Sequence, residues 1–221
     1  MFIPFYVDFY SAMDVNLNNK FNNLLSNIDL NNKPNLFLHV CCGPCSLGVI
    51  QKISNYFNIY IIFYNSNIDT FIEYNLRLYE LKKIIKTLNF NFKIIYYEYN
   101  HDEFLNYIEG LEDEPEGGIR CKKCFELRLL NSVRIANEFI IDNNMTYNTN
   151  YLCTTLSVSP HKNAEMIEEI GEKICKSYKN IEYLPSDFKK EDGYLNSVKL
   201  SKKYGVYRQS FCGCEFSKCI K

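Results

Sequence analysis

The chain has 221 residues, ten of them cysteine, and a formal net charge of −1 at pH 7. Its length suits one large α/β domain or a domain with a small appendage. The near-neutral charge excludes a broadly basic surface, so any contact with nucleic acid must depend on a local patch. The longest uninterrupted apolar run, residues 59–64, is too short to span a bilayer, and we expect no membrane partner.

The cysteine content indicates metal or redox chemistry. The first ten residues are apolar, but no Lys or Arg precedes them and they include Asp8, which is unlike a secretory signal. We therefore expect a cytoplasmic protein. In that compartment a cysteine-rich chain favours metal binding or redox chemistry over a framework of structural disulfides.

Residues 1–34 are expected to form a helical lead-in, with apolar residues at helical spacing over 14–30. From residue 36 the pattern alternates between strand and helix. Strands are expected at 36–40, 59–64, 92–97 and 146–152, and helices at 44–57, 70–88, 102–108, 122–141, 159–178 and 193–204. This order predicts an α/β fold with a parallel sheet covered by helices on both faces and a helical C-terminal part. In such sheets ligands bind beyond the carboxyl ends of the strands.

Three cysteines stand where the first strand gives way to the first helix of this alternation. Cys41 and Cys42 end the strand, and Cys45 follows Gly43 and Pro44 at the start of the helix. Proline suits the first helical position, and the positive end of the helix dipole favours the thiolate that binds metal or attacks. Cys41 and Cys42 can share one centre only if the chain already turns there, which Gly43 permits.

A second pair, Cys121 and Cys124, opens a later helix beside Arg120, Lys122 and Lys123. A CxxC spacing alone fits half a zinc site, a thioredoxin-like pair or two ligands of an iron–sulfur cluster. Combined with the adjacent cysteines of the first turn, the pair gives a set of four thiolates. Both zinc and a [4Fe–4S] cluster suit such a set.

A third pair, Cys212 and Cys214, is separated by one glycine near the C-terminus. Two cysteines so close can form a small, strained disulfide that is readily reduced and can cycle. The alternative interpretation is a metal-binding pair. Three isolated cysteines are expected to act as small apolar residues, buried in the first two cases and exposed in the last: Cys153, Cys175 and Cys219.

The histidines and arginines give weaker signals. His39 lies inside the first strand and is expected to be a hydrogen-bonded core residue. His161 and Lys162 follow Ser159 and Pro160, the expected N-cap and first turn of a helix, where they can meet an anionic group. Three arginines on expected helices are interpreted as surface or salt-bridge residues: Arg77, Arg128 and Arg134.

The segment 199–209 interleaves cations with aromatic residues. Cations hold phosphates, and tyrosine rings stack on unpaired bases, so this segment is the candidate contact with nucleic acid. A solvated helix face that ends in a packed turn would show the same composition. The residues proposed for the contact are Lys202, Lys203, Tyr204, Tyr207 and Arg208.

Taken together, the motifs resemble those of the QueH-type epoxyqueuosine reductases. The resemblance runs from about residue 36 to residue 217. The matching stretches are HVCCGPCS at 39–46, YNSNI at 64–68, EGLEDEPE at 109–116, RCKKCFELR at 120–128, TTLSVSPHK at 154–162, DGY at 192–194 and YRQSFCGC at 207–214.

The resemblance implies a Rossmann-like metalloenzyme domain over residues 35–221 that removes the epoxide oxygen of epoxyqueuosine at the tRNA wobble position, giving queuosine. It also implies a [4Fe–4S] cluster, a second, mononuclear iron or zinc, and an external electron donor. By matching motifs, the cluster falls on Cys41, Cys42, Cys121 and Cys124, the redox-active pair on Cys212 and Cys214, and the additional metal beside Cys45.

Two other classes of function compete with this interpretation. An ATP-dependent tRNA sulfur transferase would need a Ser-Gly-Gly-x-Asp-like phosphate loop after the first strand, where this chain has Cys-Cys-Gly-Pro-Cys. A non-catalytic zinc module that binds RNA would use the same cysteines without iron. The colour of the purified protein separates the reductase from the zinc module, because an iron–sulfur protein is brown and a zinc protein is colourless.

Overall fold

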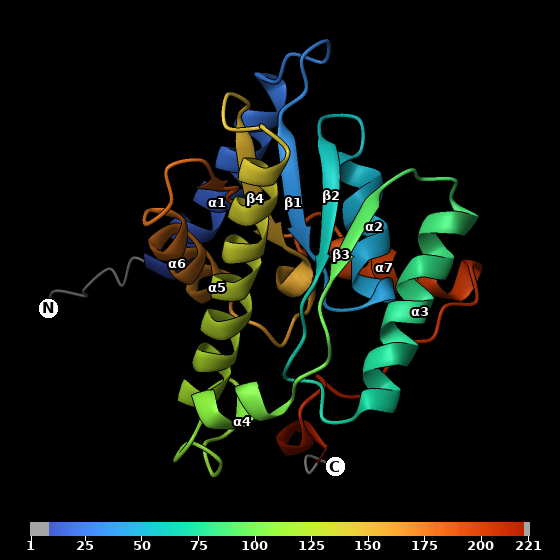
Figure 1. Cartoon of the computed structure of the whole chain (residues 1–221), viewed down its shortest axis with the longest axis vertical. Coiled ribbons are helices and arrows are strands. Elements are labelled where there is room, and N and C mark those ends of the chain that lie inside the picture. Colours follow the sequence, from blue (N-terminus) through green and yellow to red (C-terminus); the bar gives the residue numbers. More distant parts are fainter. Residues whose placement is uncertain (1–8, 219–221) are drawn as a thin grey trace, which may run out of the picture.

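The computed structural model describes residues 9–218, and Cys219, which the sequence places at an exposed chain end, lies outside the described residues. A sheet of parallel strands in the order β3-β2-β1-β4-β5 forms the centre (Figure 1). The strands are β1 (Asn35–His39), β2 (Asn58–Phe63), β3 (Lys93–Tyr96), β4 (Asn150–Thr154) and β5 (Glu182–Tyr183). The predicted α/β class with a parallel, Rossmann-like sheet is therefore confirmed.

Helices cover both faces of the sheet, as the alternating pattern predicts. They are α1 (Phe9–Ser26), α2 (Gly43–Ile53), α3 (Phe71–Thr87), α4 (Asp102–Tyr107), α5 (Ile119–Asp142), α6 (Ala164–Cys175) and α7 (Gly193–Lys203). Successive residues of a strand point to opposite faces. Leu36 and Leu38 of β1 accordingly join a core with α1, α2 and α3, while Phe37 joins a second core with α5 and α6. Helix α7 packs on α2 outside the first core.

Several elements differ from the sequence prediction, among them β4, which begins at Asn150 rather than at residue 146. The expected helix from Ser159 begins instead at Ala164, because residues 155–158 form a 3-10 helix and Asn163 caps α6 by accepting a hydrogen bond from the Met166 amide at 3.0 Å. The lead-in helix ends at Ser26, and Asp29 accepts a hydrogen bond from the Asn31 amide in the turn that follows. The two-residue strand β5 is too short to give a sequence signal.

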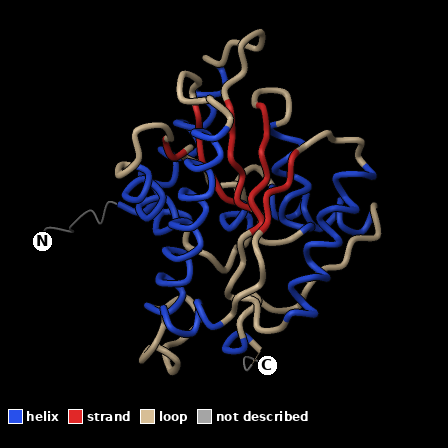
Figure 2. Tube along the Cα trace, viewed as in Figure 1, coloured by secondary structure: helices blue, strands red, loops and turns tan. Residues whose placement is uncertain are grey.

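The carboxyl edge of the sheet contains the switch point of the topology. β1 lies between β2 and β4, and His39 at its end aligns with Ile62 on one side and Thr154 on the other. Chain connections leave β1 and β4 in opposite directions, which opens a crevice of the kind that binds ligands in such folds. In Figures 1 and 2 the loops that leave this edge run toward α4, the start of α5 and the C-terminal segment.

No helix within residues 9–218 combines the length and the apolar character that crossing a bilayer requires.

Gly171 in the middle of α6 supports the docking of this helix on the sheet. A Cβ at this position would lie 2.5 Å from the Tyr183 Cζ atom of β5, so Gly171→Ala forces the ring or the helix to move. We expect it to lower the free energy of unfolding by about 1–3 kcal/mol, measured by urea denaturation. Gly48→Ala in α2 is the matched control, since its nearest neighbour would lie at 3.4 Å and alanine favours the helix. Equal effects of the two substitutions would contradict the packing.

Candidate metal and redox centre

The three-cysteine turn brings its sulfur atoms together. Cys42 is the N-cap of α2 in an extended conformation, with proline in the first turn as predicted. The Sγ atoms of Cys41, Cys42 and Cys45 all lie within 4.8 Å of one another, and those of Cys41 and Cys42 are 3.8 Å apart. Thr155, at the end of β4, accepts a hydrogen bond from the Cys41 amide at 3.2 Å. The crevice between β1 and β4 thus holds a thiol triad.

The triad favours one thiolate at a time. Hydrogen bonds from the Cys42 and Cys45 thiols hold the pKa of Cys41 well below its ordinary value. The same bonds raise the pKa of Cys42 to about 11 and also raise that of Cys45. A shared negative charge on clustered sulfur atoms is the donor chemistry that metal binding uses.

Cys121 and Cys124 lie in the first two turns of α5, after the acidic loop of residues 109–116. Arg120 is buried and donates hydrogen bonds to the carbonyl oxygens of Glu112, at 2.6 Å, and Glu114, which ties the loop to the helix. The Gly117 amide donates to Cys121 Sγ at 3.2 Å. Burial raises the pKa of Cys124 to about 12. The acidic loop before α5 therefore helps to position this pair.

Cys212 connects two cavities. It lines a cavity of about 410 Å³ together with Cys41 and Cys45. It also lines a narrower one of about 110 Å³ together with Cys121, Cys124 and Cys214. Cys212 and Cys214 are both free thiols, the first partly buried and the second buried. The third predicted pair therefore lies in the same crevice as the other two.

The structure groups these seven cysteines in two sets. One set is the compact triad at the β1–α2 turn. The other consists of the four cysteines around the narrower cavity. The predicted cluster ligands Cys41, Cys42, Cys121 and Cys124 thus come from both sets, and their joint ligation stays a prediction.

Two cations stand among the sulfur atoms. Arg128 of α5, expected at the surface or in a salt bridge, is only 2 % exposed and donates a hydrogen bond to Asn65 Oδ1 at 2.5 Å. Burial lowers its pKa, but the negative charge that Cys124, Cys41 and Cys212 carry when ionised outweighs this effect and raises the pKa. A surface position for Arg128 is wrong, because the packing of α5 buries its guanidinium against Asn65, which follows β2.

Lys162 is the second cation. It lies between the 3-10 helix and α6, is partly buried and lines both cavities together with His161. Burial lowers the pKa of Lys162, but the charge that Cys212, Cys41 and Cys45 carry when ionised raises it above its usual value. His161 and Lys162 thus face the crevice rather than a helix N-terminus, since α6 begins only at Ala164.

The remaining expectations for isolated residues hold. His39 is fully buried, and its ring nitrogens contact Thr154 Oγ1 at 2.6 Å and the Tyr64 carbonyl oxygen at 3.1 Å. Burial, with the nearby Arg128 charge, lowers its pKa to about 3. Cys153 and Cys175 are buried apolar residues. Arg77 is buried and forms a salt bridge with Glu73 at 2.7 Å.

The tRNA candidates are divided by the structure. Arg208 is exposed, lines the wider cavity and lies over the Tyr194 ring at 5.3 Å. Lys202 and Lys203 are exposed at the end of α7. The hydroxyl of Tyr207 donates to Glu73 at 3.2 Å, so this ring has a structural contact. The contact with tRNA stays a prediction for all five candidates.

Sequence reasoning missed the residues that follow β2. Asn65 donates to the Val40 carbonyl oxygen at 3.0 Å and accepts from Arg128. Asn67 lines the narrower cavity, and its Oδ1 atom is buried without a hydrogen-bond partner. The YNSNI stretch was noted only as part of the resemblance. Two asparagines directly after a buried strand were the available signal.

Comparisons with known proteins agree with this geometry. The model of the family "Epoxyqueuosine reductase QueH" matches residues 36–219. The chain belongs to this family. It is 36% identical over 189 residues to the epoxyqueuosine reductase QueH of Streptococcus pyogenes, covering 84% of this chain and 71% of the relative. The QueH proteins of Staphylococcus aureus (35% over 200 residues, 84% and 76% covered) and Thermotoga maritima (33% over 183 residues, 82% and 89% covered) are similar too.

Membership of the QueH family covers every cysteine of the crevice. The matched region includes the three-cysteine turn, the CxxC pair and the CGC pair, whereas the lead-in helix α1 lies before it. The comparisons thus confirm the predicted family, and this chain is an oxidoreductase of that family.

Proposed function

We propose that this chain reduces epoxyqueuosine to queuosine at the wobble position of tRNA, in the cytoplasm, with electrons from an external donor. The observation that carries the proposal is the convergence of three cysteine motifs of a QueH protein on one crevice at the β1–β4 switch point. The wider cavity, about 410 Å³ in volume, has room for a single modified nucleobase.

We assign a [4Fe–4S] cluster to Cys41, Cys42, Cys121 and Cys124. Four thiolates suit this cofactor, which supplies single-electron transfer when it is bound. The donor set is anionic, and the buried Arg128 supports the assignment because its charge meets Cys41 from one pair and Cys124 from the other. Cys45 is left to hold a second, mononuclear iron or zinc. The Sγ atoms of Cys41, Cys42 and Cys45 lie within 4.8 Å of one another, which supports a metal-binding role for this turn.

The proposed roles of Cys212 and Cys214 follow from the balance of the reaction. Removing the epoxide oxygen as water consumes two electrons and two protons. Oxidation of the two thiols to one disulfide releases the same two electrons and two protons, and the external donor then restores the dithiol. Cys212 lines both cavities, so its sulfur lies between the proposed cluster site and the proposed nucleobase site.

Other residues of the wider cavity bind and orient the substrate in this proposal. Lys162 presents a cation beside the sulfur atoms, where it can donate a hydrogen bond to an oxygen of the bound nucleoside. Gln209 has a buried Oε1 atom without a partner in the same lining, and it can accept a hydrogen bond from the base. Arg208 and Tyr194 form the rim that is expected to meet the adjoining nucleotides.

The competing functions have less support. This chain does not have the phosphate loop that a tRNA sulfur transferase needs, because Cys41 to Cys45 occupy the turn after β1. A zinc module that only binds RNA would leave Cys212 and Cys214 without a role, although they lie at the cavity together with the other cysteines.

Cysteine variants test the proposal through an anaerobic assay on tRNA that carries epoxyqueuosine, with loss of one oxygen atom measured by mass spectrometry. Replacing any one of the four proposed cluster ligands by Ala should lower iron and sulfide content together. Cys212→Ser or Cys214→Ser should leave both contents unchanged and stop multiple turnover, because one remaining thiol cannot form the disulfide that releases the two electrons.

Cys175→Ala is the control for these variants, since this residue is buried at the end of α6, outside the lining of both cavities. Loss of iron from the Cys212 or Cys214 variant would make that pair a ligand set. Full turnover in both serine variants would remove the pair from the mechanism.

Arg128→Gln tests whether the buried guanidinium compensates an anionic cluster. The cluster's reduction potential should fall, roughly by 50–100 mV, because one nearby charge at moderate effective dielectric contributes a few kcal/mol. A redox titration followed by electron paramagnetic resonance measures the potential. Arg134→Gln is the control, since Arg134 lies on the same helix but is exposed and bonded to Asn131. An unchanged potential in the Arg128 variant would contradict the proposed ligand set.

A triple variant tests the proposed tRNA contact. Replacing Lys202, Lys203 and Arg208 by Gln should weaken tRNA binding, because fewer counterions are then released. The slope of log affinity against log salt should become shallower by about 2. Binding measured over a range of salt concentrations gives this slope.

The control for the tRNA variant removes the same charge elsewhere, through Lys173, Lys176 and Lys179→Gln, which are exposed at and after the end of α6. If this control alters the slope and the first variant does not, tRNA binds a different face.

A further inference from the structure

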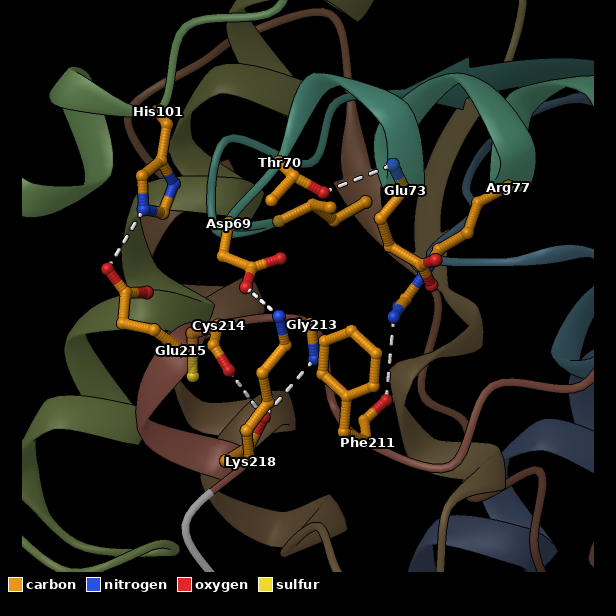
Figure 3. A network of polar contacts seen from close by, with 12 residues as sticks. Asp69, Thr70, Glu73, Arg77, His101, Phe211, Gly213, Cys214, Glu215 and Lys218 are labelled. Atoms are coloured by element: carbon orange, nitrogen blue, oxygen red, sulfur yellow. Dashed lines mark hydrogen bonds and ion pairs between the residues drawn. The ribbon is translucent and has the colours of Figure 1, made fainter.

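Hydrogen bonds with a row of buried and partly buried polar side chains hold the segment that carries Cys212 and Cys214 against α3. Glu73, Arg77 and Glu80 occupy successive turns on one side of α3, and all three contact this segment. Glu80 accepts a hydrogen bond from the Tyr207 amide at 3.1 Å, and Glu73 accepts one from the Tyr207 hydroxyl. Arg77 donates hydrogen bonds to the carbonyl oxygens of Cys212 and Phe211, and Figure 3 shows Arg77 beside Phe211.

Arg77 uses all of its guanidinium nitrogens in this arrangement. Nη1 donates to the Cys212 carbonyl oxygen at 2.9 Å, and Nη2 donates to the Phe211 carbonyl oxygen at 3.5 Å. Nε donates to Glu73 Oε1 at 2.7 Å. The guanidinium also lies over the Phe211 ring, with its carbon 5.2 Å from the centroid. At 2 % exposure, this charge is committed to the cysteine segment rather than to solvent.

Gly213 is held from the other side. Its carbonyl oxygen accepts a hydrogen bond from the Asp69 amide at 3.0 Å, and its φ of +144° is a conformation that favours glycine. A Cβ here would lie 3.0 Å from Asn67 Nδ2 and 3.4 Å from Arg77 Nη1. Both carbonyl groups between the two cysteines are thus fixed by the start of α3 and the loop before it.

Flanking contacts restrain the ends of the segment. Lys218 forms an ion pair with Asp69, and His101 Nε2 lies 3.1 Å from Glu215 Oε1 (Figure 3). The Ser217 hydroxyl bonds to the Cys214 carbonyl oxygen at 2.7 Å. Arg77 is the contact that reaches the Cys212 carbonyl itself.

We propose that Arg77 is a positioning residue that holds Cys212 in its dithiol geometry at the junction of the two cavities and thereby makes the Cys212–Cys214 disulfide more oxidising. The pair is present as two free thiols with these carbonyls bonded. Joining the two sulfurs across one glycine closes a small ring, and we expect the peptide groups beside Gly213 to rotate when it forms, since disulfide geometry is narrow. Contacts made only in the dithiol favour that state over the disulfide.

This inference rests on the redox role proposed for the pair, with the same balance: two thiols lose two electrons and two protons to form one disulfide. Removing Arg77 should therefore favour the disulfide. A tenfold change in the dithiol–disulfide equilibrium constant is expected, which is about 30 mV toward more negative potential for a two-electron couple.

The experiment is a titration of the full-length, cluster-loaded protein in dithiothreitol buffers of defined ratio, with thiol trapping and mass mapping of Cys212 and Cys214. Arg77→Lys keeps the charge but loses the forked donor and should shift the potential partway. Glu73→Gln with Arg77→Met avoids an unpaired buried carboxylate and should give the full shift. Lys82→Met is the charge-matched control, since Lys82 is exposed on α3 and contacts Tyr96.

The visible spectrum of the cluster should stay unchanged in all three variants, which shows that the rest of the centre is intact. In turnover, kcat should fall while KM stays constant, because Arg77 does not line the wider cavity. A potential equal to wild type in both Arg77 variants would overturn the positioning role. Wild-type turnover by Cys212→Ser would instead overturn the proposed redox function, whatever the titration shows.

Discussion

Arg128 and Lys162 place positive charge among sulfur atoms that come from three distant parts of the chain. Seven cysteines gather at the carboxyl edge of the sheet, where thiolates would repel one another without nearby cations. Burying a charge is costly unless it is paired, so the guanidinium and the thiolates depend on each other. Helix α5, the turn after β1, the segment before α6 and the C-terminal segment together bring these cations and cysteines into one crevice.

The sequence predicts the central strands of the sheet well because each has a clear signal in its own residues. The apolar runs at β1 and β2 are bounded by turn residues, and both strands form within a residue or two of their expected ends. Helix boundaries are predicted less well where two nearby residues could each cap the helix. Ser159 is the expected N-cap of α6, but Asn163 caps this helix. Thr154 instead caps a 3-10 helix that occupies the residues before Ser159, so α6 begins later in the chain. Burial of β5 depends on neighbours far away in sequence.

The site also has residues that the sequence identifies and residues that only the tertiary fold reveals. Cysteine spacing identifies the candidates, because few other roles explain three such motifs in one chain. The charges around them could not be assigned, since Arg77 and Arg128 look like ordinary helix-surface residues until α3 and α5 are packed. The grouping of thiols is equally tertiary. Cys41 meets Cys45 through one local turn, whereas Cys212 meets Cys121 only because the chain returns to the sheet edge.

Analysis of iron, acid-labile sulfide and zinc in the full-length protein, purified without oxygen, tests the central claim most directly. The buried cations are expected to balance an anionic iron–sulfur centre. The account therefore predicts iron and sulfide in nearly equal amounts and a brown protein that loses both when Cys41 or Cys124 is replaced. A colourless protein that carries zinc without sulfide, and that retains it in those variants, would contradict the account.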